Sequence, residues 1–215
     1  MSVDLSSVRV VVITDRRQCP DLVDRIGSIV RAVPPGSVLV QVREKDLDGG
    51  PLLALVERVI AVARPAGAPV WVNDRLDVAL AAGADGVHVP ERGLPIADAR
   101  ALIDHEGSKL ALGCSRHATE AVRPAFGAGA DLVQLGPIWE TPGKGDPLGP
   151  KALGIEVPVD MRLVAVGGVH TVERARQAAA AGADAVAVIR AAWTSTDPGK
   201  MIAALVAAVG AGHLA

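Results

Sequence analysis

The chain has 215 residues, half of them hydrophobic, with a formal net charge of −2, one phenylalanine, three tryptophans and no tyrosine. This composition excludes a basic nucleic-acid surface and, with so few aromatic rings, a stacking platform for single strands. The two cysteines, Cys19 and Cys114, exclude a disulfide framework and a cysteine metal cage. No apolar run approaches the ~20 residues of a membrane span and none reads as a signal peptide, so we expect a cytoplasmic protein with no membrane partner.

Short apolar runs alternate along the chain with longer segments rich in Ala, Leu and Val. Because buried parallel strands read as continuous hydrophobic stretches, the runs predict eight strands, in chain order residues 8–14, 38–42, 70–73, 86–89, 110–113, 132–135, 163–166 and 185–189. The segments between and after them predict helices at residues 21–32, 51–63, 75–82, 96–104, 118–127, 172–181 and 198–209. This alternation favours a closed α/β barrel over an open doubly wound sheet.

A Gly-Ala-Asp turn recurs at residues 83–85, 129–131 and 182–184, each time between a predicted helix and a predicted strand. Glycine suits the left-handed position that closes a helix. The three glycines are 46 and 53 residues apart, and each gap corresponds to about two strand–helix units of a (β/α)8 barrel. We therefore predict a single-domain TIM barrel over residues 1–215, with its chemistry at the carboxyl ends of the strands.

The connection after the sixth strand, residues 137–160, breaks this pattern because it is long and rich in proline and glycine. A loop of this length inside a compact domain is usually functional. We predict that it closes over a substrate, because Gly143 and Gly145 flank Lys144 and give the backbone freedom there.

Paired glycines after the seventh strand, Gly167 and Gly168, are the clearest local sign of a ligand. They let backbone N–H groups approach a phosphate, and the following helix adds its positive end. Ile189 and Arg190, at the end of the eighth strand, complete the predicted phosphate site, where a guanidinium binds phosphate bidentately. A tight turn at the glycine pair and a solvated Arg190 at a helix start are the structural alternatives.

Two cations, Arg43 and Lys45, lie on one side of the segment that ends the second strand. Such a pair suits a second anion, either a diphosphate or a carboxylate, and an ion-pair network with Glu44 or Asp74 is the alternative. Asp74, after the third strand, is suited equally to holding a Mg²⁺ on phosphate oxygens and to orienting Arg or Lys side chains.

His117, just past the fifth strand, is the candidate proton carrier, because imidazole titrates near neutral pH and Ser115 lies beside it at the barrel mouth. A structural role for His117 is the alternative. His88 lies within the apolar fourth strand, and we expect it to be a core histidine.

Seven segments, in order and with matching spacing, resemble the thiamine-phosphate synthase and TenI-type thiazole tautomerase family over nearly the whole chain. They lie at residues 40–46, 72–80, 83–89, 113–118, 136–144, 164–168 and 183–189. The resemblance implies a barrel whose small-molecule partner is thiazole phosphate, and it leaves a homo-oligomer open. In the synthase branch a hydroxymethylpyrimidine diphosphate is joined to the thiazole phosphate with Mg²⁺, and pyrophosphate is released.

For the synthase branch, the resemblance implies that Asp74 binds Mg²⁺ and that the pyrimidine diphosphate is held by Gln41, Arg43, Lys45, Asn73, Ser115, Thr141 and Lys144. The chain departs from this branch at Gly93, where a second metal-binding aspartate is expected. Gly143 stands in place of the second threonine of a Thr-Pro-Thr-Lys motif, and Arg190 in place of a serine.

These departures weaken diphosphate chemistry and do not affect the end of the site that binds the monophosphate. The favoured function is therefore the tautomerase, an isomerase that needs no metal or other cofactor. The resemblance implies that His117 moves the proton that aromatises a thiazole carboxylate phosphate, while Arg43 or Lys45 holds the carboxylate. Glu140 and Thr141 are expected at the substrate, because an aromatic-Glu-Thr sequence is familiar in this branch. The alternatives are the synthase, a transferase with an altered Mg²⁺ site; a non-catalytic phosphate-binding barrel; and a sugar-phosphate barrel enzyme.

Overall fold

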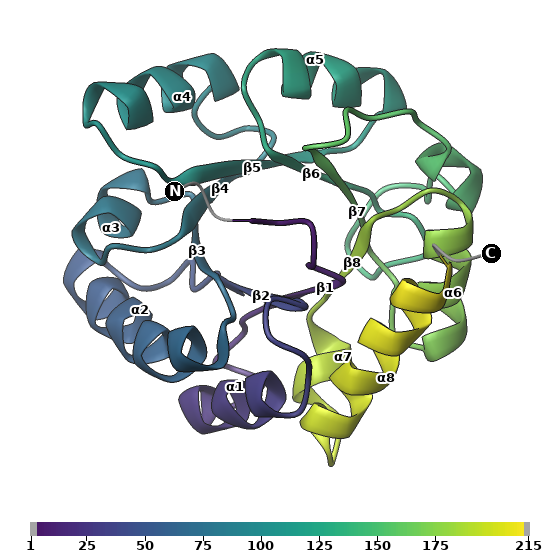
Figure 1. Ribbon diagram of the computed structural model, residues 1–215, viewed down its shortest axis with the longest axis horizontal. Helices are drawn as coiled ribbons and strands as arrows, with labels where there is room; N and C mark the ends of the chain where they lie inside the picture. Colours follow the sequence, from purple (N-terminus) through teal and green to yellow (C-terminus); the bar gives the residue numbers. More distant parts are fainter. Residues whose placement is uncertain (1–3, 213–215) are drawn as a thin grey trace.

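The computed structural model describes residues 4–212 and shows a closed barrel of eight parallel strands ringed by helices (Figure 1). The strands, in chain and barrel order, are β1 (Val10–Ile13), β2 (Val38–Val42), β3 (Val70–Asn73), β4 (Gly86–Val89), β5 (Ala111–Arg116), β6 (Leu132–Leu135), β7 (Arg162–Val166) and β8 (Ala185–Val188). Each strand pairs with the next, and β8 closes on β1 with Val186 opposite Val10. The predicted TIM barrel is therefore confirmed.

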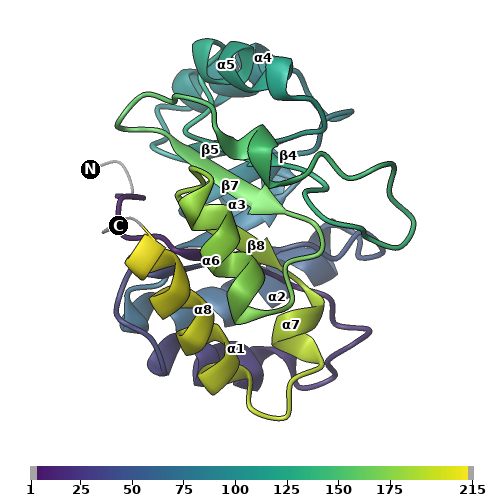
Figure 2. The same cartoon turned by 90° about the vertical axis from the view of Figure 1, so that its right-hand side faces the viewer.

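The helices pack around the outside of the barrel, and Figure 2 shows α1, α6 and α8 side by side on one flank. They are α1 (Leu22–Arg31), α2 (Gly49–Ala63), α3 (Leu76–Ala81), α4 (Ile96–His105), α5 (Val122–Gly127), α6 (Val172–Ala180), α7 (Arg190–Trp193) and α8 (Pro198–Gly212). Three short 3-10 turns, η1 (Arg64–Ala66), η2 (Thr119–Ala121) and η3 (Pro150–Leu153), lie in the connections. Among the helices of the described residues, none is both long and apolar enough to cross a membrane.

The barrel interior is filled by side chains over its amino-terminal part. Inward-facing residues such as Val11, Leu39 and Trp71 form a core separate from the one between strands and helices. The Trp71 indole fits because Gly86 and Gly113 face it, and a Cβ at either glycine would lie within 2.5 Å of the ring. The interior of the barrel therefore opens toward the carboxyl ends of the strands.

The recurring Gly-Ala-Asp turns fasten neighbouring strands together. The glycines adopt positive φ, as predicted for helix closure. Each aspartate carboxylate then accepts a hydrogen bond from a backbone N–H of the preceding strand: Asp85 from Val70 at 2.8 Å, Asp131 from Leu112 at 2.7 Å and Asp184 from Leu163 at 2.8 Å. These bonds tie β3 to β4, β5 to β6 and β7 to β8 at their amino-terminal ends.

Some element boundaries differ from those predicted. β5 runs on to Arg116, because Ser115 and Arg116 still pair with β6 although their side chains are polar. The predicted helix at 118–127 divides into η2 and α5. Helix α7 was not predicted, because its four residues are too few for helical periodicity to show.

Candidate active site

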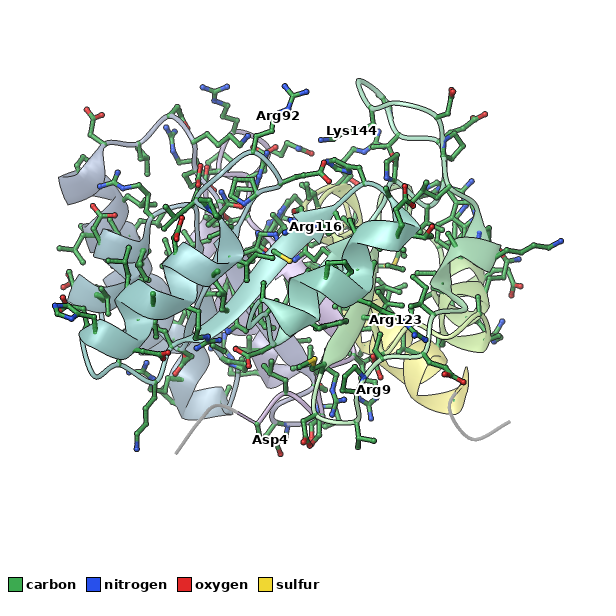
Figure 3. All side chains as sticks on the ribbon, turned by 90° about the horizontal axis from the view of Figure 1, so that it is seen from above. Asp4, Arg9, Arg92, Arg116, Arg123 and Lys144 are labelled. Atoms are coloured by element: carbon green, nitrogen blue, oxygen red, sulfur yellow. The ribbon has the colours of Figure 1, made fainter. Side chains whose placement is uncertain are left out.

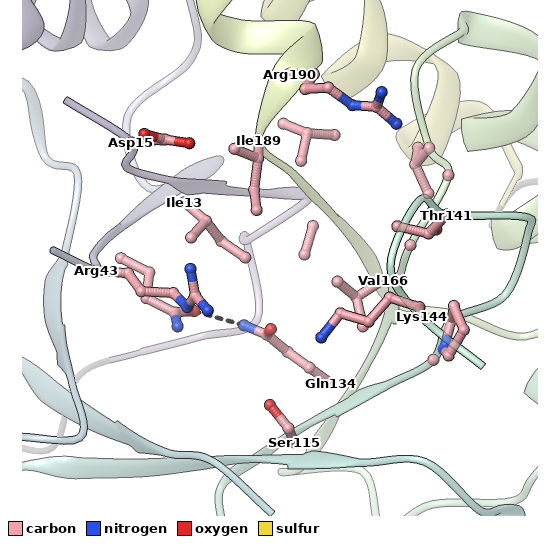
Figure 4. Close-up of a pocket in the computed structure, with 18 of the residues that line it drawn as sticks. Ile13, Asp15, Arg43, Ser115, Gln134, Thr141, Lys144, Val166, Ile189 and Arg190 are labelled. Carbon is pink, nitrogen blue, oxygen red and sulfur yellow. Dashed lines mark hydrogen bonds between the residues drawn. The ribbon is translucent and has the colours of Figure 1, made fainter. Parts of the chain in front are cut away.

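A cavity of about 410 Å³ opens at the carboxyl ends of the strands (Figure 4). Twelve of the fourteen predicted site residues line it, and they come from the ends of six strands, all but β1 and β4: Gln41, Arg43, Lys45, Asn73, Ser115, His117, Thr141, Lys144, Gly167, Gly168, Ile189 and Arg190. The two that lie outside its lining are Asp74 and Glu140. The parallel strands thus bring together residues that are up to 149 positions apart, from Gln41 to Arg190.

The floor of the cavity is a row of buried side-chain amides. Gln134 Nε2 donates to Gln41 Oε1 at 2.6 Å, and Gln41 Nε2 donates to Asn73 Oδ1 at 3.1 Å. All three residues are at most 9% exposed. Buried polar groups of this kind persist only when they are hydrogen-bonded, so the row holds three strands in fixed register at the floor.

Four cations surround the cavity above this floor: Arg43, Lys45, Lys144 and Arg190. Within residues 4–212, none of these side chains forms an ion pair or a hydrogen bond. Figure 4 shows Lys144 reaching in from the loop opposite Arg43, and Figure 3 places Lys144 on the face opposite Asp4 and Arg9. Unpaired cations crowded at one cavity form a site for a multiply charged anion.

Glu44 does not form the alternative ion-pair network with Arg43 and Lys45. The Glu44 carboxylate is buried and accepts hydrogen bonds from the Arg16 backbone N–H at 3.1 and 3.2 Å. Burial raises the pKa of Glu44. Thr14 Oγ1 accepts from the Arg43 backbone N–H at 2.8 Å. Contacts between the ends of β1 and β2 therefore fix the backbone and leave the Arg43 and Lys45 side chains to the cavity.

Gly167 and Gly168 line the opposite side of the cavity with φ of 93° and 73°. A Cβ at Gly168 would lie 2.6 Å from the Cβ of Trp139. The Arg174 guanidinium, 5.5 Å from the Trp139 ring centroid, donates to the Gly168 carbonyl at 2.6 Å. The backbone of the glycine pair is thus held between the start of α6 and the loop after β6.

The loop after β6 projects beyond the carboxyl ends of the strands in Figure 2. Its first part is fixed to β7, because Ile138 N–H donates to the Val166 carbonyl at 2.9 Å. Lys144 N–H donates to the Thr141 carbonyl at 3.1 Å, which makes a turn that carries both residues at the cavity. Closure of this loop on a ligand stays a prediction.

The two histidines at the mouth differ in their surroundings. His117 lies at the rim, where its Nδ1 is hydrogen-bonded to the Gly136 carbonyl. Its Nε2 lies 3.6 Å from the Glu91 carboxylate. His88 is buried, as predicted for a core residue, and its Nε2 lies 2.8 Å from Ser115 Oγ. Burial, with smaller contributions from the charges of Arg43 and Arg116, lowers the pKa of His88 to about 3.

Asp74 lies beside the cavity lining rather than in it. Its φ of 63° is unusual for a residue other than glycine. Within residues 4–212 its carboxylate has no hydrogen-bond or ion-pair partner, and a Cβ at Gly93 would lie 3.0 Å from its Oδ1. The same part of the chain contains no cluster of three or more His, Cys, Asp or Glu side chains that would hold a metal.

The cavity is also lined by residues that were not predicted to belong to the site, among them Ile13, Gln18, Gln134, Val166, Ala187 and His170. Gln134 is the most informative of them. It is the one polar residue in the four-residue strand β6, and its alternation with Leu135 places it inside the barrel. That alternation was the available signal.

The chain matches the family model described as thiamine monophosphate synthase over residues 10–192. It is 39% identical to a putative thiamine-phosphate synthase of Geobacter sulfurreducens, over 91% of each chain. It is 36% identical to the thiamine-phosphate synthase of a Roseiflexus species, over 93% of this chain and 84% of the relative. The solved structure of a thiamine phosphate pyrophosphorylase from Pyrococcus furiosus superposes with a TM-score of 0.84 at 28% identity, covering 97% of this chain and 98% of the other.

These comparisons correct the favoured function and enzyme class. Relatives 35–39% identical to the chain over most of its length are named thiamine-phosphate synthase, so the predicted TenI-type thiazole tautomerase, an isomerase, is wrong. The prediction gave the carboxylate missing at Gly93 more weight than the cations Arg43, Lys45 and Lys144, which the fold gathers at one cavity. The chain belongs to the thiamine monophosphate synthase family.

Proposed function

We propose that this protein is a thiamine-phosphate synthase, a transferase that joins hydroxymethylpyrimidine diphosphate to thiazole phosphate and releases pyrophosphate. The observation that carries the proposal is the set of four unpaired cations around one cavity that also contains the Gly167–Gly168 turn. A tautomerase substrate carries a single phosphate and a carboxylate, whereas the two synthase substrates together bring three phosphoryl groups. The number of unpaired cations agrees better with the larger charge.

The thiazole phosphate is assigned to the glycine pair. Backbone N–H groups at Gly167 and Gly168 and the positive end of α6 bind its phosphate, with Arg190 after the neighbouring strand β8. A side chain at either glycine would collide with Pro137 or Trp139, so the close approach of backbone to phosphate depends on both glycines.

The pyrimidine diphosphate is assigned to Arg43, Lys45 and Lys144. The bond between the pyrimidine methylene carbon and the diphosphate oxygen breaks, and the diphosphate leaves with the electron pair. The lone pair of the thiazole ring nitrogen then forms the new C–N bond to the methylene carbon. The three cations stabilise the charge that develops on the leaving diphosphate, and they do so most strongly where water is excluded.

Asp74 fits a magnesium ion that is held by one protein carboxylate together with substrate phosphates, a usual arrangement for this metal. Its carboxylate has no partner in residues 4–212 and is therefore free to bind the metal. Glu91 is already engaged with His117, at 3.2 Å from its backbone N–H. We therefore propose a single-carboxylate site, in which bound Mg²⁺ neutralises part of the diphosphate charge.

A turnover assay on the purified chain tests the proposal. Thiazole phosphate and hydroxymethylpyrimidine diphosphate are supplied with and without Mg²⁺, and thiamin phosphate and pyrophosphate are measured together. We expect equal amounts of both products and no product when either substrate is omitted. Binding of both substrates without product would instead identify a non-catalytic phosphate-binding barrel.

The roles of His117 and Glu140 stay predictions, and neither is needed for the proposed bond changes. We also propose that the protein works in the reducing cytoplasm. Cys19 and Cys114 are both free and buried, and burial raises the pKa of Cys114 to about 11, which keeps its thiol unreactive.

A further inference from the structure

The row of amides formed by Gln134, Gln41 and Asn73 at the cavity floor has, in the described part of the chain, a polar atom without a protein partner at each end. Within residues 4–212, Gln134 Oε1 and Asn73 Nδ2 form no hydrogen bond, although both residues line the cavity and are at least nine-tenths buried. Gln134 Nε2 also keeps a second N–H beyond the one given to Gln41. Buried polar groups that face a cavity without protein partners are positioned for a ligand that supplies the missing partners.

We propose that Gln134 determines substrate specificity by hydrogen bonding to the amino group and the adjacent ring nitrogen of the substrate pyrimidine. This inference rests on the proposed function. A carboxamide offers a carbonyl acceptor and an N–H donor side by side. An aminopyrimidine presents the complementary pair, an amino donor next to a ring-nitrogen acceptor, as adenine does toward Asn and Gln. A thiazole ring has a single nitrogen acceptor and no N–H, so it leaves the Gln134 carbonyl unpaired.

The neighbouring amides fix which way the Gln134 amide faces. Gln134 donates to Gln41, and Gln41 donates to Asn73, so reversing Gln134 requires Gln41 and Asn73 to reverse with it. An oxo analogue of the pyrimidine, with its ring N–H beside a carbonyl, has the opposite order of donor and acceptor. In the orientation of the structure the row matches the amino form, and pairing with the oxo form would require all three amides to reverse together.

The surroundings of Gln134 agree with a ring at the floor and a diphosphate at the rim. Ile13, Val166 and Ala187 supply apolar lining near the floor, which suits the faces of a heterocycle. Figure 4 shows Gln134 between Arg43 on one side and Lys144 on the other, both of which carry their charge into the cavity. A pyrimidine seated on Gln134 thus directs its diphosphate toward these cations.

Competition binding tests this inference without turnover. Hydroxymethylpyrimidine diphosphate and its oxo counterpart are titrated into the wild-type protein, with inorganic pyrophosphate as the ligand that lacks a ring. We expect the amino form to bind on the order of 100-fold more tightly than the oxo form, because a site built to hydrogen-bond a group rejects the mismatched analogue strongly.

The variant Gln134→Met keeps the volume but removes both polar groups, and its two dissociation constants should then differ by less than about threefold, within the range of a shape effect. Its affinity for pyrophosphate should stay unchanged, which shows that the variant is folded and its rim intact. Gln18→Met is the matched control, because Gln18 lines the same cavity outside the amide row and is exposed, and it should keep the full preference.

An amino preference that survives in Gln134→Met, or a wild-type protein that binds both forms equally or prefers the oxo form, overturns the inference. These outcomes are separate from those of the turnover assay. Thiamin phosphate formation with no effect of Gln134→Met removes the inference and leaves the proposed function. An amino preference that depends on Gln134, without any turnover, removes the proposed function and leaves the inference.

Discussion

His88 Nε2 on β4 and Ser115 Oγ on β5 lie 2.8 Å apart at the edge of the cavity. His88 is buried, and within residues 4–212 its Nδ1 has no hydrogen-bond partner. A proton on Nε2 leaves only a lone pair unpaired, whereas a proton on Nδ1 leaves a buried N–H unpaired, which is the costlier arrangement. The neutral His88 therefore donates to Ser115, and the Ser115 hydroxyl turns its own proton toward the cavity.

His88 should make the protein less stable in mild acid. Its folded-state pKa of about 3 lies below the ordinary value of 6.5, so the unfolded chain takes up the proton first as the pH falls. Above pH 6.5 the titration of His88 does not change the free energy of unfolding. Below it the free energy of unfolding should drop by about 1.4 kcal/mol per pH unit. Urea unfolding at pH 7 and pH 5 measures this slope.

The variant His88→Asn should have a smaller difference between pH 7 and pH 5, because it lacks the group that titrates. His105→Asn is the control, since His105 is exposed at the end of α4, and it should behave like the wild type. An unchanged pH dependence in His88→Asn would show that other groups cause the acid sensitivity.

Removing a rim cation should weaken binding of the pyrimidine diphosphate. Lys144→Met should lower kcat/KM by roughly 10- to 100-fold, which corresponds to one charge-assisted hydrogen bond of about 1.5–3 kcal/mol. Steady-state kinetics with each substrate varied in turn measure the effect, and the KM for thiazole phosphate should change little. Arg92→Met is the matched control, because Arg92 lies on the same face in Figure 3 but outside the cavity lining. Equal losses in both variants would indicate only long-range charge attraction.

The phosphate site should depend on the absence of a side chain at Gly168. Gly168→Ala places a Cβ 2.6 Å from Trp139 at a φ of 73°, so the backbone must shift away from its phosphate-binding position. The KM for thiazole phosphate should rise about tenfold or more, and the variant should also lose about 1–3 kcal/mol of stability. Gly50→Ala is the control, since a Cβ there meets nothing within 4 Å, and it should keep both values near those of the wild type.

A second carboxylate beside Asp74 should strengthen magnesium binding. Gly93→Asp adds one next to Asp74 Oδ1, and we expect the Mg²⁺ concentration for half-maximal turnover to fall about tenfold, since added ligand charge raises cation affinity. Calorimetric titration of Mg²⁺ in the presence of pyrophosphate gives the same comparison without catalysis. Gly93→Asn keeps the shape and lacks the charge. If Asn and Asp act alike, the effect comes from shape and not from a metal ligand.

The sequence predicts the barrel well because buried parallel strands leave a direct trace in apolar runs. The strand at residues 70–73 matches β3 at both ends. Predictions are weaker where polar side chains continue a strand, as at Ser115 and Arg116 in β5, and where an element is as short as α7. Composition alone carries no signal in either case.

The cavity lining was largely predictable, because parallel strands deliver the residues that follow them to one mouth. Gln134 was not predicted, although it is the one polar residue of β6 and its alternation with Leu135 directs it into the barrel. The choice between two reactions was wrong for a different reason. It gave the carboxylate missing at Gly93 more weight than the cations Arg43, Lys45 and Lys144, although these were already among the candidate site residues.

The three aspartate clips, at Asp85, Asp131 and Asp184, each join an even-numbered strand to the odd-numbered one before it. The clips therefore fasten three strand pairs, β3–β4, β5–β6 and β7–β8, and within residues 4–212 the other junctions between neighbouring strands, such as β2–β3, β4–β5 and β6–β7, are seams without such a clip. New chain ends introduced by circular permutation should be tolerated at a seam, between α2 and β3 for example, because both partners of every clip stay on the same side of the cut. The same operation between β3 and β4 separates Asp85 from Val70 along the chain, and such a permutant should fold more slowly.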